Sequence, residues 1–222
     1  MGTADIGDPD LFVVRNEVDT EFAYHCDELA ARFPDATEVD YTAGDRVPLD
    51  GADGVVLTGS TAAVHETDSY PWIAEQETLV RALVDRAIPT LGVCFGHQVA
   101  NVALGGTVEN VGSTATLVEA SLADDPLFEG VGPVVVALHG DAVTKPGRDM
   151  AVIASAAHDR VFGTRHRTAP LWTVQFHPEI TATRREDLVD DFGWQAGQCS
   201  FADVTAERVF ENFERLVSET VG

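Results

Sequence analysis

The most informative segment of the chain is Leu91-Gly92-Val93-Cys94-Phe95-Gly96-His97-Gln98. It places a Gly-x-Cys-x-Gly between a short apolar run, which predicts a buried strand, and a segment that predicts a helix. This is the pattern of a nucleophile elbow, a sharp turn that exposes its central side chain at the carboxyl end of a sheet. The flanking glycines relieve crowding in such a turn, and the helix N-terminus favours a thiolate. The alternative is that Cys94 is a small buried residue in an ordinary turn.

Short apolar runs and amphipathic segments alternate on the N-terminal side of this stretch. Strands are predicted at residues 11–14, 37–41, 54–57 and 90–93, and helices at residues 18–33 and 71–87. Because the strands are continuously apolar, they indicate a parallel sheet that is covered on both faces.

The pattern changes after residue 111, where strands follow one another through short turns. Further strands are predicted at residues 114–120, 134–138, 151–154, 161–164 and 171–176, and helices at residues 183–190 and 204–217. We therefore expect an α/β three-layer sandwich whose central sheet is mixed, mainly parallel and flanked by helices. Since no linker or internal repeat interrupts the chain, we expect residues 1–222 to form one domain with a core at about residues 11–217.

The composition is strongly acidic. The chain has 37 Asp and Glu against 14 Lys and Arg, of which Lys145 is the one lysine, and a net charge of −23. Since 45% of the residues are hydrophobic, the chain is nonetheless expected to fold, and its acidic surface argues against partners such as nucleic acid or an anionic membrane. Evenly scattered carboxylates favour adaptation to molar salt over an acidic face for a basic partner. We expect reversible loss of structure at low ionic strength.

Three features predict a cytoplasmic protein. Cys26, Cys94 and Cys199 are an odd number of cysteines without a CxxC, which argues against a disulfide framework. The first ten residues lack the basic and apolar regions of a signal peptide. No apolar stretch approaches the roughly 18 residues that a membrane span needs.

A second motif, Gln175-Phe176-His177-Pro178-Glu179, supplies a base for a cysteine nucleophile. A predicted strand ends at His177, and in extended chain a side chain two residues on lies on the same side. Glu179 is therefore expected to bond one imidazole nitrogen while the other faces Cys94. Both motifs follow apolar strands, so they are expected to meet at the carboxyl edge of one sheet. The alternative for His177 is an ordinary surface or core histidine.

The two motifs, Gly-Val-Cys-Phe-Gly-His-Gln and Gln-Phe-His-Pro-Glu, resemble those of the class I (triad) glutamine amidotransferase family. The resemblance covers about residues 11–217 and implies a flavodoxin-like fold. It implies Cys94 as nucleophile, His177 as general base and acid, and Glu179 as the group that orients His177. It also implies that the Phe95 N–H donates to the oxyanion and that Gln98 binds the substrate glutamine.

Two weaker motifs agree with this resemblance. Gly59 follows the strand at 54–57, where the family has a Gly-rich loop that gives the second oxyanion donor, and Ser60 would border the substrate. The family often has Gly-Gly-Pro there, whereas this chain has Gly-Ser-Thr. The segment around His139 and Asp141 is similar to one in GMP-synthase-type domains, where its backbone would flank the glutamine pocket. The alternative for that segment is a surface turn.

The resemblance implies release of ammonia from glutamine through a γ-glutamyl thioester, without a metal or cofactor. Since 222 residues leave no room for a synthetase domain, ammonia is expected to pass to a separate synthetase, for example a GMP-synthase-like one. One alternative is a stand-alone hydrolase of γ-glutamyl peptides or amides. Another is a non-catalytic protein that binds and regulates a partner, against which the complete Cys94, His177 and Glu179 set argues.

Overall fold

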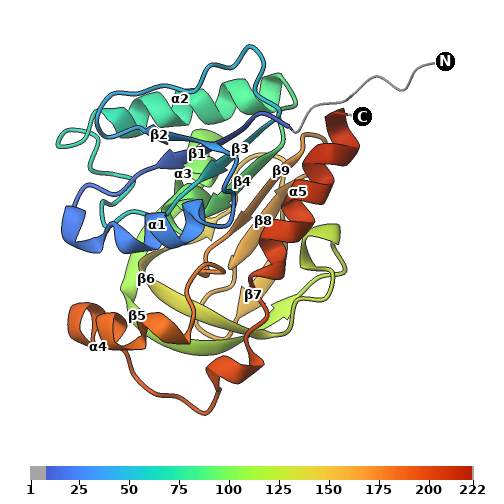
Figure 1. Ribbon diagram of the computed structural model, residues 1–222. Helices are drawn as coiled ribbons and strands as arrows, with labels where there is room; N and C mark the ends of the chain where they lie inside the picture. Colours follow the sequence, from blue (N-terminus) through green and yellow to red (C-terminus); the bar gives the residue numbers. More distant parts are fainter. Residues whose placement is uncertain (1–8, 222) are drawn as a thin grey trace.

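The computed structural model describes residues 9–221. In these residues nine strands form one sheet, in the order β2-β1-β3-β4-β9-β8-β7-β5-β6 (Figure 1). The expectation that the N-terminus is not a signal peptide rests on the first ten residues, and the first eight of these lie outside the described part of the chain. Within the described part, no helix has both the length and the apolar character of a membrane span.

The elements follow the alternating order that the sequence predicts. The strands are β1 (Leu11–Arg15), β2 (Thr37–Asp40), β3 (Gly54–Leu57), β4 (Thr90–Val93), β5 (Thr107–Leu122), β6 (Val134–Lys145), β7 (Met150–Ala156), β8 (Gly163–His166) and β9 (Leu171–Val174). The α-helices are α1 (Tyr24–Ala30), α2 (Trp72–Asp85), α3 (Phe95–Ala103), α4 (Arg185–Phe192) and α5 (Arg208–Val221). The 3-10 helices are η1 (Thr20–Phe22), η2 (Pro126–Phe128), η3 (Ala182–Arg184) and η4 (Phe201–Asp203).

The sheet is mixed, as predicted. Strands β2, β1, β3, β4 and β9 pair in parallel. Strands β9, β8, β7, β5 and β6 pair antiparallel. Strands β4 and β9 are neighbours with Val93 opposite Val174, so their carboxyl ends lie side by side. The α/β sandwich predicted from the sequence is therefore confirmed.

Helices cover both faces of the parallel half. Along β1, Leu11 and Val13 belong to one hydrophobic cluster, and Phe12 and Val14 belong to another. The first cluster includes residues of α1 and α5, and the second includes residues of α2 and α3. Figure 1 shows α2 on the opposite side of the strands from α1 and α5. This two-sided burial explains why these strands are apolar at successive positions.

A third, smaller cluster lies at the antiparallel end. It joins Leu117 of β5, Val134 and Val136 of β6, and Leu188 of α4. Trp194 from the irregular segment after α4 packs into the same cluster. The segment 191–201, which has no clear sequence pattern, thus holds α4 against the β5–β6 pair.

Two predicted helices begin later than their apolar spacing suggests. The helix expected at 18–33 is η1 followed by α1, because the Glu17 carboxylate accepts the Val18 and Asp19 N–H groups in a tight turn. The helix expected at 204–217 is α5, which starts at Arg208. Val204 forms a bridge with Val134 at the sheet edge, so it is held in extended chain.

Strands β5 and β6 exceed their predicted lengths most. Strands β5 and β6 pair over most of their length, with register irregularities near Thr107 and between Asn110 and Thr114. The outer part of β5 is mostly exposed, and in the outer part of β6 the buried residues His139, Ala142 and Val143 are interrupted by polar and glycine positions, so neither part shows a continuous apolar pattern. The interpretation of residues 139–141 as a surface turn is wrong, because these residues lie within β6.

Candidate active site

Cys94 occupies a strained turn between β4 and α3. Its backbone has φ 51° and ψ −103°, a conformation that costs a non-glycine residue on the order of 1–3 kcal/mol. A Cβ atom on Gly92 would lie 2.6 Å from the Gly96 carbonyl oxygen, and one on Gly96 would lie 2.4 Å from the Leu57 carbonyl oxygen. Both positions therefore require glycine. The Cys94 N–H donates to the Val174 carbonyl at 2.9 Å, which fixes the turn against β9.

His177 and Glu179 lie beyond the end of β9, beside this turn. His177 Nδ1 is 2.6 Å from Glu179 Oε1, and the Glu179 side chain is fully buried. Nε2 of His177 and Sγ of Cys94 both approach the Leu138 carbonyl oxygen, at 3.2 and 3.8 Å. The structure therefore brings the three side chains together at the carboxyl edge of β4 and β9.

The environment of His177 favours its charged form. Burial opposes the charge, but the Glu179 carboxylate and the neighbouring Cys94 sulfur outweigh it and hold the pKa of His177 well above its ordinary value. The second carboxylate oxygen of Glu179 is buried and has no hydrogen-bond partner among the described residues. Its charge is thus directed mainly at the imidazole, as an ion pair with protonated His177 requires.

Gln175 is a site residue that the sequence interpretation missed. It is fully buried, its Nε2 lies 3.6 Å from Cys94 Sγ, and its Oε1 accepts from Gln98 Nε2 at 3.2 Å. It also precedes His177 by two residues, so the rule that pairs His177 with Glu179 could have identified it. Gln98 in turn donates to the Asp141 carbonyl at 2.9 Å. An amide network therefore joins the nucleophile to β6.

The loop after β3 borders the other side of the site. A Cβ atom on Gly59 would lie 3.4 Å from Cε1 of His177, so Gly59 packs against the ring of the candidate base. Phe95 is the first residue of α3, where backbone N–H groups have no intrahelical acceptor. Ser60 Oγ accepts the Ala62 N–H at 3.0 Å and thereby shapes the loop.

His139 and Asp141 lie on β6, which borders the same region. His139 is buried and its Nε2 lies 3.1 Å from His158 Nε2. Burial, together with the His158 and His177 rings, lowers the pKa of His139 to about 4 despite its bond to the Asp141 backbone, so the ring is neutral at pH 7. The Asp141 carboxylate accepts from Asn110 Nδ2 at 2.9 Å.

A cavity of about 460 Å³ connects these groups. Six of the residues singled out in the sequence line it, namely Ser60, Cys94, Gln98, His139, Asp141 and His177. The other three, Gly59, Phe95 and Glu179, adjoin this lining. His25 also lines the cavity, although its sequence context has no motif. In the described residues, no three His, Cys, Asp or Glu side chains are grouped so as to hold a metal ion.

The chain is similar to several known proteins. The model of the glutamine amidotransferase class-I family matches residues 23–196. A glutamine-hydrolyzing GMP synthase from Caldanaerobacter subterraneus is 28% identical over 76% of this chain and 32% of its own length. The chain thus spans about a third of that relative. One of the subunits of a glutamine-hydrolyzing GMP synthase from Methanothermobacter thermautotrophicus is 30% identical over 72% of this chain and 73% of its own length.

Solved structures agree on the fold. A glutamine amidotransferase from Thermotoga maritima superposes with a TM-score of 0.72 at 18% identity, covering 97% of this chain and 95% of that one. The family match extends over more than half of the chain and includes both the elbow of Cys94 and the His177 motif. The chain belongs to the class I glutamine amidotransferase family.

Proposed function

We propose that this protein hydrolyses the side-chain amide of glutamine and that the ammonia serves a separate synthetase. The observation that carries the proposal is the convergence of Cys94, His177 and Glu179 on one cavity, with the 2.6 Å His177–Glu179 bond behind the thiol. We further take the chain to act as a single amidotransferase domain.

Cys94 is the proposed nucleophile. Its thiolate attacks the carbon of the side-chain amide, forming a C–S bond while the carbonyl oxygen becomes an oxyanion. The backbone N–H groups of Gly59 and Phe95 would stabilise that oxyanion, each by roughly 3 kcal/mol. The strained turn places the side chain in the lining of the cavity, and the glycines on either side allow the close backbone approach that this turn needs.

His177 is the proposed proton carrier. Its imidazolium gives a proton to the amide nitrogen, so ammonia leaves and a γ-glutamyl thioester remains. His177 then accepts a proton from the attacking water, and glutamate and the free thiol are released. Glu179 holds the ring in place and stabilises its charge in both steps. Gln98, Ser60, His139 and Asp141 are proposed to border the bound glutamine.

The acceptor of the ammonia is proposed from the relatives. One relative that matches 72% of this chain is named as a subunit of a GMP synthase. This supports a separate GMP-synthase-type synthetase as the acceptor. We also propose a cytoplasmic location and an adaptation to high salt, for which the free thiols and the net charge of −23 are the support.

Glutamate and ammonia release from glutamine, measured in molar KCl, tests the activity. We expect wild-type protein to be active and Cys94→Ala to lose at least about 10⁴-fold, because the covalent step is gone. Cys199→Ala is the matched control, since Cys199 is partly exposed and lies outside the cavity. Turnover by Cys94→Ala at the wild-type rate would refute the assignment of the nucleophile.

The same assay with γ-glutamyl dipeptides separates the proposal from the stand-alone hydrolase. Hydrolysis of the dipeptides in preference to glutamine would contradict the proposal. A rise in glutamine turnover when a purified GMP-synthase acceptor domain and its substrates are added would support ammonia transfer.

A further inference from the structure

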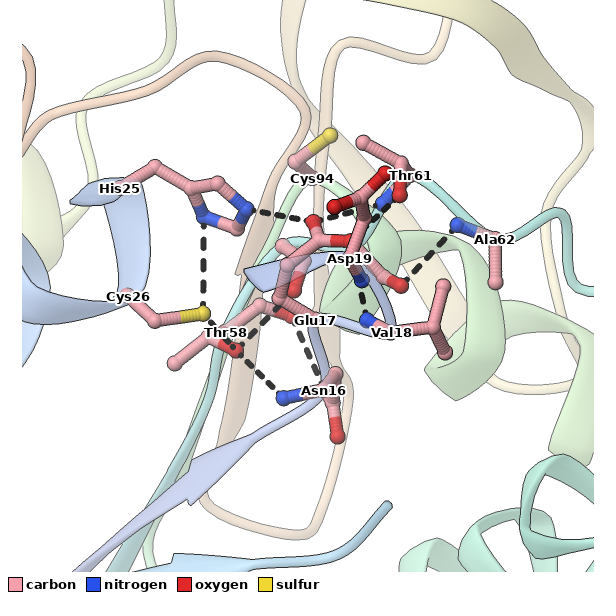
Figure 2. Close-up of polar contacts among 12 residues, drawn as sticks. Asn16, Glu17, Val18, Asp19, His25, Cys26, Thr58, Thr61, Ala62 and Cys94 are labelled. Atoms are coloured by element: carbon pink, nitrogen blue, oxygen red, sulfur yellow. Dashed lines mark hydrogen bonds and ion pairs between the residues drawn. The ribbon is translucent and has the colours of Figure 1, made fainter. Parts of the chain in front are cut away.

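A second group of polar side chains, mostly buried, adjoins the cavity and has no role in the Cys94 chemistry described above (Figure 2). Its centre is Glu17, two residues beyond β1, whose side chain is only 2% exposed. A buried carboxylate is costly unless it is fully paired, so such a group is kept where its partners matter.

Five donors converge on this carboxylate. His25 Nε2 donates to Oε2 at 2.8 Å, as does the Thr61 N–H at 2.8 Å. The Val18 and Asp19 N–H groups donate to Oε1 at 2.9 and 3.0 Å, and so does the Thr61 hydroxyl. Burial opposes ionisation, but the bonds from His25, Thr61 and Asp19 outweigh it and lower the pKa of Glu17. The group is therefore a carboxylate at neutral pH.

The bonds from Thr61 to Glu17 fix the C-terminal end of the loop that follows β3, residues 58–61. The N-terminal end is held by the residue before Glu17, because the Asn16 N–H and side-chain amide bond Thr58 Oγ1 and its carbonyl oxygen, each at 3.0 Å. Gly59 lies between the two attachments. It is the residue type with the greatest backbone freedom, and the sequence 58–62 has no proline to restrict it. The conformation of Gly59 thus depends on Asn16 and Glu17.

His25 connects this group to the catalytic histidine. Its ring lies edge-on to the His177 ring, with centroids 6.1 Å apart and planes at 80°. A Cβ atom on Gly59 would meet Cε1 of His25 at 3.3 Å and Cε1 of His177 at 3.4 Å. Gly59 is therefore packed between the two rings, and His25 is kept in place by its bond to Glu17. Figure 2 shows the hydrogen bond between the His25 ring and the Glu17 carboxylate as a dashed line.

We propose that Glu17 is a positioning residue for the oxyanion site. Through both donors of Thr61 and through His25, it sets the 58–61 loop so that the Gly59 N–H points at the carbonyl oxygen that Cys94 attacks. This inference rests on the proposed function, since it assigns Glu17 a role in the same reaction. It goes beyond the Cys–His–Glu set, because Glu17 is not among the residues that line the cavity and acts only through Thr61 and His25.

Glu17→Gln tests the inference, with Glu21→Gln as the matched control because Glu21 is exposed. Glutamine turnover should show kcat reduced on the order of 10–100-fold with KM nearly unchanged, since a displaced oxyanion donor affects the transition state most. The aldehyde analogue of glutamine, to whose carbonyl carbon the thiol adds to give a tetrahedral adduct, should lose affinity by a similar factor. Alkylation of Cys94 by iodoacetamide, which forms no oxyanion, should keep its rate.

The opposite result is a Glu17→Gln protein that has a lower melting temperature but wild-type kcat and aldehyde affinity. Glu17 would then be structural only, and the inference would fail. If Glu17→Gln does not fold, Thr61→Val keeps the backbone donor and removes the hydroxyl, and should show smaller losses of the same two quantities; unchanged values would overturn the inference. A wild-type protein that neither hydrolyses glutamine nor binds the aldehyde contradicts the proposed function itself.

Discussion

His177 Nδ1 and Glu179 Oε1 are 2.6 Å apart, and the two side chains are 4% and 0% exposed. Because water is excluded from this pair, the carboxylate acts on the imidazole with little screening. This contact, together with the Cys94 sulfur, keeps the pKa of His177 high against the effect of burial. The proton that the leaving ammonia needs is therefore held on His177 over a wide pH range.

Glu179→Gln should lower the pKa of His177, because the amide keeps a hydrogen bond but loses the charge. The imidazolium is the acid for the leaving group, so the alkaline limb of the kcat/KM profile should move to lower pH. We also expect kcat/KM at its optimum to fall roughly 10²–10⁴-fold. A pH profile of glutamine hydrolysis from about pH 5 to about pH 10 measures both effects.

Glu186→Gln provides the control for that profile, since Glu186 is an exposed carboxylate on α4. Its profile should match that of the wild type. An alkaline limb that stays in place in Glu179→Gln would mean that Glu179 does not set the protonation of His177.

Gly96→Ala should damage both stability and activity. The new Cβ would lie 2.4 Å from the Leu57 carbonyl oxygen and 2.9 Å from its Cβ, so the start of α3 must move away from β3. Such crowding costs about 1–3 kcal/mol or more, and a nucleophile displaced by about 1 Å loses on the order of 100-fold in rate. Thermal unfolding and glutamine turnover measure the two losses.

Gly140→Ala is the stability control for this change. A Cβ there would have Asn110 Nδ2 as its nearest neighbour at 3.6 Å, an ordinary contact. We expect its melting temperature to stay near that of the wild type. Equal melting temperatures for Gly96→Ala and Gly140→Ala would contradict the close approach of α3 to β3.

Gln175→Glu should make Cys94 less reactive at neutral pH. The change replaces a donor 3.6 Å from the sulfur by a negative charge, which disfavours the thiolate. The rate of Cys94 alkylation by iodoacetamide should therefore fall at pH 7, and its pH dependence should move to higher pH. Gln195→Glu, in the irregular segment, should leave the rate unchanged. An unshifted profile in Gln175→Glu would show that Gln175 does not influence the sulfur.

The sequence predicts the site where its residues are close along the chain or follow adjacent parallel strands. Cys94 and His177 meet because β4 and β9 are neighbours, and Glu179 follows His177 by two residues. The contact between Glu17 and Thr61 joins positions 44 residues apart and depends on a turn that no periodicity marks. For the same reason α1 begins later than its apolar spacing predicts.

The polar parts of the sheet escape sequence patterning for a different reason. The outer ends of β5 and β6 are held by backbone pairing with each other; the outer end of β5 is mostly exposed, and in β6 the buried positions are separated by Gly140 and Asp141. Binary patterning detects strands by their buried face, so it finds only the inner residues of both strands. His139 and Asp141 thus lie in a strand that borders the cavity, and the alternative interpretation of this segment as a surface turn is wrong.

The arrangement of charges predicts how the fold responds to salt. Seven arginines pair with carboxylates in the described residues, namely Arg15, Arg46, Arg81, Arg86, Arg165, Arg184 and Arg215. Exposed pairs of this kind contribute about 0–1 kcal/mol each, and salt weakens them. With 37 acidic and 14 basic residues, however, the carboxylates far outnumber the cations, so a net repulsion among them is expected. Salt relieves that repulsion, so its net effect should be stabilising.

We therefore expect the melting temperature to rise steadily from dilute buffer to molar KCl, where the Debye length falls from roughly 30 Å at 0.01 M to about 3 Å at 1 M. Circular dichroism should show that structure lost in dilute buffer returns when KCl is added. Choline chloride should act like KCl if screening is the cause, because it has the same ionic strength with a different cation. A melting temperature that is constant across this range would mean that screening of the net charge of −23 by salt does not stabilise the fold. The acidic surface would then require another explanation, such as a basic partner.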